Sequence, residues 1–196
     1  MFRFCVAAPL LCALTAQAET QSLNLFGQSL AFELPAGWKQ ASFEERPGVI
    51  SAEFVPELEN LNEWNSLICV QSFKVADAGM LPENFLDSLA SSYAGACQGN
   101  VTYEKLGDVE VNGHRGVHGI LGCSRMPNQH QSMENQRPFF SEPTGEVGYF
   151  SVISRPGQLL LLHKSMRGDV FQEDKVPLTG ANHKAFISAM MPIKLL

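Results

Sequence analysis

The segment Glu146–Met166, EVGYFSVISRPGQLLLLHKSM, decides the fold of this chain. Two runs rich in aliphatic and aromatic residues flank Pro156-Gly157, a dipeptide that is typical of tight turns. The segment is therefore predicted to form a β-hairpin with strands over Glu146–Ser154 and Gln158–Met166. The unbroken run of four leucines that opens the second strand indicates that this strand is buried.

Further strands are predicted on both sides of this hairpin. Val101–Val111 and His114–Met126 are joined at Asn112-Gly113, which is the strongest short-range hairpin signal. Trp64–Val75 has an apolar centre, LICV, and is expected to be a central strand that is covered on both faces. Shorter strands are predicted over Leu23–Phe26, Ser29–Glu33 and Val49–Val55.

Two helices complete the predicted architecture. Pro82 suits the first position of a helix over Pro82–Cys97, because its missing N–H would have no partner there. Apolar residues then recur at helical spacing and form one stripe, which consists of Phe85, Leu86, Leu89, Ala90, Tyr93 and Cys97. A second helix is expected over Ala181–Met191. The fold class is therefore α+β, with an antiparallel sheet of about six to eight strands packed by two main helices.

The first 18 residues, MFRFCVAAPLLCALTAQA, have the pattern of a secretory signal peptide. Arg3 precedes an apolar run, and Ala16-Gln17-Ala18 supplies the small residues that the peptidase requires. The run is shorter than the roughly 20 apolar residues that span a bilayer, and no later stretch is long and apolar enough to do so. We expect cleavage after Ala18, a single domain over residues 19–196, and a periplasmic or extracellular location.

Composition excludes some classes of function. The 196 residues include 14 Lys and Arg against 20 Asp and Glu, a formal charge of −6. An acidic chain of this kind is a poor match for nucleic acid, whose binding requires clustered cations. The hydrophobic fraction of 45% is enough to form a core, and the charged fraction of 17% is too low for a disordered chain.

Several stretches resemble one family of proteins. They are LPAGW (Leu34–Trp38), EFVPELENLNEWNSLICVQSF (Glu53–Phe73), the helix that ends at Cys97, the strand that carries Cys123, and GEVGYFSVISRPGQLLLLHKSMRGD (Gly145–Asp169). In this order they resemble small exported Gram-negative proteins that are similar to the PsbP-like and DcrB-like α/β sandwiches. The resemblance implies a PsbP-like sandwich and an envelope location, and it implies no catalytic residues.

The cysteines of the exported chain are Cys69, Cys97 and Cys123, in a compartment where cysteines tend to pair. Cys97 lies on the apolar stripe of the first helix, and Cys123 shares a strand face with Val117 and Leu121. If that stripe covers that face, the two sulfur atoms can meet, so we predict a Cys97–Cys123 disulfide with Cys69 as a buried thiol. The alternative is three unpaired cysteines in the core.

No catalytic or metal-binding set is evident in the sequence, and no cofactor is expected. The pattern HRGVH, His114 to His118, would bring two imidazoles together on a helix, but the neighbouring glycines favour a strand. On a strand the two side chains lie about 13 Å apart, too far to share a metal ion, so we expect both to face solvent. The chain also lacks a nucleophile elbow, a P-loop, a dinucleotide fingerprint and a C-x-x-C pair.

The polar segment Pro127–Gly145 is longer than compact domains usually leave without secondary structure. It carries Arg137, Phe139 and Phe140, a cation beside two aromatic residues, which is the composition of a binding hot spot. The alternative is that both phenylalanines pack onto the sheet. If they bind a partner, replacing both with alanine weakens partner capture and leaves the melting temperature unchanged, whereas a loss of folding assigns them to the core.

We therefore expect a non-enzymatic periplasmic domain that binds a protein or another component of the envelope. The alternative is an immunity protein, an inhibitor or a secretion accessory, for which the acidic balance would suit a basic partner. An envelope hydrolase is less favoured, because its site would have to assemble from residues that are distant in the sequence.

Overall fold

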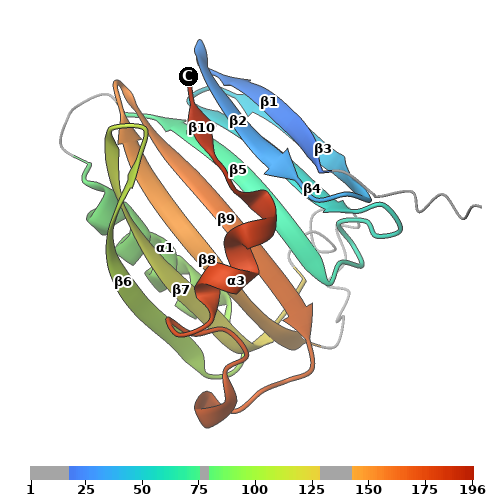
Figure 1. Cartoon of the computed structure of the whole chain (residues 1–196). Coiled ribbons are helices and arrows are strands. Elements are labelled where there is room, and N and C mark those ends of the chain that lie inside the picture. The colour runs from blue at the N-terminus through green and yellow to red at the C-terminus, as the bar shows by residue number, and fades with distance from the viewer. Residues whose placement is uncertain (1–17, 76–79, 129–142) are drawn as a thin grey trace, which may run out of the picture.

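A computed structural model describes residues 18–75, 80–128 and 143–196, and its centre is a seven-stranded antiparallel sheet (Figure 1). The predicted signal peptide, apart from Ala18, and the predicted loop residues Arg137, Phe139 and Phe140 lie outside these ranges. In spatial order the strands are β3 (Trp38–Arg46), β4 (Val49–Pro56), β5 (Ser66–Lys74), β9 (Gln158–Gly168), β8 (Thr144–Arg155), β7 (His114–Met126) and β6 (Val101–Val111).

The predicted hairpin around Pro156-Gly157 is present, and it occupies the middle of this sheet next to β5, which was predicted to be central. Arg155 pairs with Gln158, and the register continues to Gly145 and Gly168. The four leucines of β9 are all buried because successive side chains enter opposite layers. Leu159 and Leu161 pack with the side chains beneath helix α1 (Pro82–Ala96), and Leu160 and Leu162 belong to the larger core on the other face.

The expectation of one sheet of six to eight strands is wrong in part, because a second sheet lies beside the first. It contains β1 (Glu19–Leu25), β2 (Gln28–Leu34) and β10 (Lys194–Leu195). The sequence prediction missed β3 and β10. Seven of the nine residues of β3 are exposed, so the strand lacks the alternation that reveals a half-buried strand. β10 has two residues, which are held by pairing with β2.

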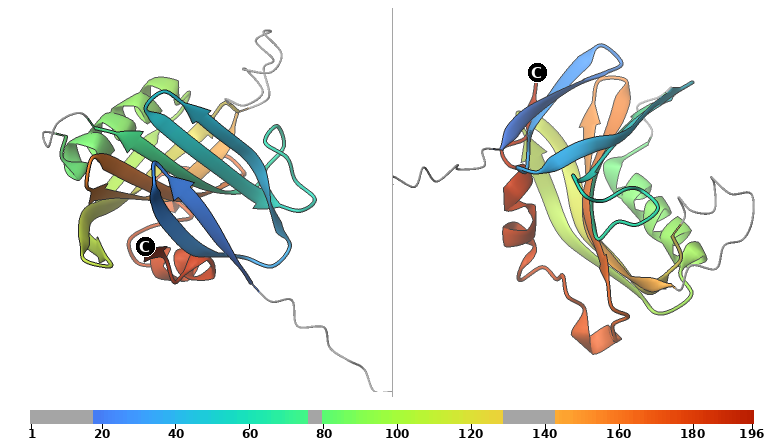
Figure 2. Two further views of the ribbon diagram at one scale, coloured as in Figure 1. Left: turned by 90° about the horizontal axis from the view of Figure 1, so that it is seen from above. Right: turned by 90° about the vertical axis from the view of Figure 1, so that its right-hand side faces the viewer.

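Helix α1 and the C-terminal segment lie on opposite faces of the large sheet (Figure 2). α1 confirms the first predicted helix: Pro82 lies in its first turn, and Leu86 and Ala90 are buried against the sheet. Among the described residues, no helix is both long enough and apolar enough to cross a membrane.

The second predicted helix is shorter than expected. α3 covers only His183–Ile187 and is followed by a 3-10 turn, η2 (Ser188–Met190). Residues 179–182 instead form a turn in which the Asn182 side chain accepts a hydrogen bond from the Thr179 amide. At the other end, Lys164 Nζ on β9 donates to the Phe186 carbonyl at 2.7 Å. This side chain therefore satisfies one of the carbonyls that a short helix leaves without an intrahelical partner.

Candidate functional site

Helix α1 covers only part of its face of the sheet. It packs on β7 and β8, while β3 and β4 extend beyond it (Figures 1 and 2). The uncovered part forms a groove of about 790 Å³. Its floor comes from β3, β4, β5 and β9, one wall comes from Leu89 and Tyr93 of α1, and Leu61, Asn62 and Trp64 form another side. We call this surface the α1 groove.

Cross-strand rows give the floor of the α1 groove its chemical character. One row runs from the edge inward as Ser42, Glu53, Cys69 and His163. The next row runs as Glu44, Ser51, Gln71 and Leu161. Hydroxyl, carboxylate and amide groups therefore lie toward the β3 edge, and apolar area increases toward the middle of the sheet. A floor of this kind offers hydrogen-bond partners beside an apolar patch, as binding sites usually do.

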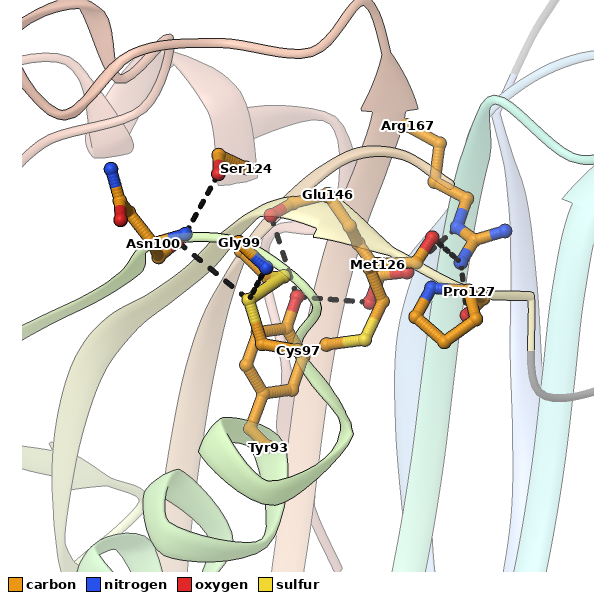
Figure 3. The surroundings of a disulfide bond; sticks show 10 residues. Tyr93, Cys97, Gly99, Asn100, Ser124, Met126, Pro127, Glu146 and Arg167 are labelled. Atoms are coloured by element: carbon orange, nitrogen blue, oxygen red, sulfur yellow. Dashed lines mark hydrogen bonds and ion pairs between the residues drawn. A yellow bond between two sulfur atoms is a disulfide. The ribbon is translucent and has the colours of Figure 1, made fainter. Parts of the chain in front are cut away.

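A largely buried ion pair between β8 and β9 lines the groove, and Figure 3 shows the two side chains. Arg167 Nε on β9 donates to Glu146 Oε2 on β8 at 2.7 Å, and the two side chains are only 8% and 13% exposed. The second Glu146 oxygen accepts a hydrogen bond from the Tyr93 hydroxyl at 3.1 Å. Burial, followed by the negative charge of Glu146, raises the pKa of Tyr93 well above its ordinary value, so this hydroxyl stays protonated.

Arg167 also fixes the chain that leaves β7. Its Nη2 donates to the carbonyls of Met126 and Pro127 at 3.3 and 2.8 Å, and its guanidinium lies 4.9 Å from the centre of the Trp64 ring. Asn128 donates from its side chain to the Asn62 carbonyl at 2.8 Å. One cation therefore links β8, β9 and the end of β7 at the border of the groove.

The disulfide lies beside this ion pair. Cys97, the residue that caps α1, is bonded to Cys123 on β7, as the sequence predicts (Figure 3). Cys123 is opposite Glu146 in the sheet register, so the bond joins the end of α1 to the strands that carry the ion pair. The C-terminal end of α1 is thereby covalently attached to the large sheet.

Cys69 is the free cysteine among the described residues and is buried in the floor of the groove. Burial, followed by the negative charge of Glu53, raises the pKa of its thiol far above the ordinary value. The Cys69 thiol therefore stays protonated, whereas a nucleophilic cysteine needs the thiolate form. His163 lies opposite it on β9. The groove therefore lends no support to a thiol hydrolase.

The expectation that both residues of the HRGVH pattern face solvent is wrong for His118. Its Nδ1 is hydrogen-bonded to the Tyr149 hydroxyl at 2.9 Å, and its ring lies 5.8 Å from that of His183 on α3. His183 stacks on Tyr149 with an interplanar angle of 3°. This cluster lies on the face opposite the α1 groove, where α3 covers the sheet. In the part of the chain that the structure describes, no three potential ligands converge on a metal site.

The imidazole cluster predicts a stability change at mildly acidic pH. Burial, followed by the proximity of His183, lowers the pKa of His118, and the buried Lys164 lies opposite Tyr149 in the register. A lowered folded-state pKa means that the unfolded chain binds the proton more readily. Stability is therefore greatest above the unfolded value of about 6.5 and falls as the pH drops below it. We expect the urea midpoint to decrease between pH 7 and pH 5, and less steeply in His118→Gln; equal slopes in both proteins would contradict this.

Sequence reasoning missed the Glu146–Arg167 pair, although a signal was available. Both are charged residues within largely apolar hairpin strands, and a turn at Pro156-Gly157 sets Glu146 opposite Arg167. Two opposite charges that face each other in a buried hairpin predict an ion pair. The α1 groove had no comparable signal, because its existence depends on how much of the sheet α1 covers.

The chain was compared with known proteins by sequence and by fold. No protein-family model matches the sequence, and no curated protein does either. Among solved structures, the Ran-binding protein Mog1p of Saccharomyces cerevisiae is 14% identical, with a TM-score of 0.44 over 90% of this chain and 86% of that one. A point mutant of Mog1 is 13% identical, with a TM-score of 0.45 over 85% of this chain and 84% of that one.

The solution structure of PsbP from the cyanobacterium Synechocystis is also similar. It is 15% identical, with a TM-score of 0.48 over 94% of this chain and 97% of that one. A family relationship to PsbP stays a prediction of the sequence. Kinship with the DcrB-like exported proteins stays a prediction. We draw no functional assignment from these likenesses.

Proposed function

We propose that this chain is an exported, non-enzymatic domain that binds a protein component of the cell envelope through the α1 groove. The observation that carries the proposal is the uncovered part of the large sheet, which forms a groove of about 790 Å³ between α1 and the β3 edge. Concave surfaces of this size with a few polar groups are the usual places for ligands to bind. The leader sequence supports an envelope location.

The arrangement of rigid elements supports binding more than catalysis. The Cys97–Cys123 bond joins the end of α1 to the large sheet, and the Tyr93 hydroxyl of α1 donates to Glu146, the ion-pair partner of Arg167. Burial keeps the Cys69 thiol of the floor protonated, which disfavours a role for this thiol as a nucleophile. A preformed surface of this kind reduces the entropy that a protein loses when it binds its partner.

Groove-filling substitutions test the proposal. Ser51 and Gln71 are half-buried residues on the floor, so Ser51→Trp and Gln71→Trp each place an indole in the groove. Ser91→Trp on the exposed side of α1 is the matched control. The immobilised mature proteins are incubated with an envelope extract of the cells that produce them, and retained components are identified by mass spectrometry.

We expect one component that the wild type and Ser91→Trp both retain and that both groove variants lose. Circular dichroism melts confirm that the variants are folded. Equal retention by all four proteins would show that the groove is not the binding surface.

A further inference from the structure

β3 is an exposed edge strand, with a register shift between Gln40 and Ser42 in its pairing with β4. It ends the large sheet, and within the described residues no strand lies beyond it. Seven of its nine residues are exposed, and they include Phe43, which is 47% exposed. The opposite edge, β6, differs because a neighbouring turn contacts it: the Gly180 amide donates to Glu104 Oε2 at 2.9 Å. Exposed backbone at a sheet edge is a template for an added strand.

The segment from Trp38 to Trp64, which forms β3, β4 and the loop that follows them, is acidic. Between Trp38 and Trp64 the chain has two cations, Lys39 and Arg46, and six carboxylates, which are Glu44, Glu45, Glu53, Glu57, Glu59 and Glu63. Both cations are already engaged within the chain. Lys39 Nζ donates to the Glu57 carbonyl at 2.7 Å, and Arg46 forms an ion pair with Glu44 at 2.6 Å. The net negative charge of this region therefore favours a basic partner.

The two faces of β3 differ in character. Ser42 and Glu44 face the α1 groove together with Glu53, which pairs with Ser42 on β4. Phe43 faces the opposite side and pairs with Ala52. A strand added next to β3 alternates its side chains in the same way, so one set would meet carboxylates and the other set would meet an exposed aromatic ring.

We propose that β3 is the docking edge for an extended basic segment of the partner protein, in which Lys or Arg alternates with apolar residues. The segment pairs its backbone with β3, points its cations over Ser42, Glu44 and Glu53, and packs its apolar side chains near Phe43. This proposal rests on the proposed function, because it names the partner chemistry at the outer border of the α1 groove.

Synthetic peptides test this pairing with the mature protein. The probe is a fluorescent ten-residue peptide of alternating Lys and Val, and the charge control alternates Glu and Val. Two further probes carry methyl groups on alternate amide nitrogens, one on each edge of the Lys-Val peptide. Strand addition uses only one edge of the peptide, so we expect one methylated isomer to bind like the parent and the other to lose binding. The Glu-Val peptide is expected not to bind.

Protein variants locate the site. Replacing both groove-side carboxylates, Glu44→Gln with Glu53→Gln, is expected to weaken the Lys-Val peptide about tenfold, because two charge pairs are lost. Glu110→Gln on β6, another exposed carboxylate on an edge strand, is the control and should bind like the wild type.

Three results would overturn the proposal. They are equal binding of both methylated isomers, no effect of the double variant, and absence of binding by the Lys-Val peptide. A dimer seen in sedimentation that Phe43→Lys abolishes would assign β3 to a second copy of this chain. In each of these cases, the proposed function is still supported if the wild type retains an envelope component that Gln71→Trp does not retain. Only the strand pairing is then overturned.

Discussion

Replacing Arg167 with alanine is expected to lower the free energy of unfolding by about 3 to 5 kcal/mol. The reason is that the Glu146 carboxyl group, whose side chain is only 13% exposed, would lose the guanidinium that lies 2.7 Å away. The carbonyls of Met126 and Pro127 would lose a donor at the same time. Urea unfolding at pH 7, followed by tryptophan fluorescence, measures the change.

A double substitution distinguishes the stability lost through an unpaired buried charge from the stability lost through poorer packing. When both partners become apolar, as in Glu146→Leu with Arg167→Met, most of the lost stability should return, because no buried charge is left without a partner. A double variant that is as unstable as Arg167→Ala would show that the ion pair itself is required. An Arg167→Ala variant within about 0.5 kcal/mol of the wild type, the range of an ordinary surface substitution, would contradict the described burial of this pair.

Removal of the disulfide is also expected to lower the stability of the domain by a large amount. Cys97→Ala with Cys123→Ala is expected to lower the free energy of unfolding by about 3 kcal/mol, because the bond closes a loop with a sequence separation of 26 residues. For a domain of this size we expect the melting temperature to fall by about 6 to 12 °C. Calorimetry of the exported proteins measures this shift.

Cys69→Ala is the matched control for the loss of a thiol, because Cys69 is the buried free cysteine. The melting temperature of Cys69→Ala should be the same as that of the oxidised wild type. The wild type treated with a reductant should instead melt like the double variant. Non-reducing peptide mapping should find Cys97 linked to Cys123. A linked peptide that contains Cys69 would contradict the assignment.

Short-range patterns in the sequence predicted much of the central sheet. The turn at Asn112-Gly113 is an example, because both residues adopt the positive φ that the favoured hairpin turn requires. The stripe of α1 and the alternation of β7 also predicted that Cys97 and Cys123 could meet. Each of these features depends on residues close together in the chain or on one helix facing one strand.

Other features depend on tertiary arrangement and were not predicted. β3 is exposed along most of its length, so it carries no periodic signal, and β10 is defined only by its pairing with β2. His118 is half-buried because α3 brings His183 over it, which no local pattern indicates. The α1 groove exists because a helix of 15 residues covers part of a seven-stranded sheet, and the sequence alone does not specify which part.

We propose that the α1 groove is the binding surface of this domain, and site-specific photo-cross-linking in living cells tests this directly. A photoreactive phenylalanine analogue is placed in separate variants at Ser42 and Leu61, which line the groove, and at the exposed control positions Ser91 and Glu110. We expect a cross-linked product of one discrete mass at Ser42 and Leu61 and none at the controls. The same product at Ser91 or Glu110, or no product at either groove position, would contradict it.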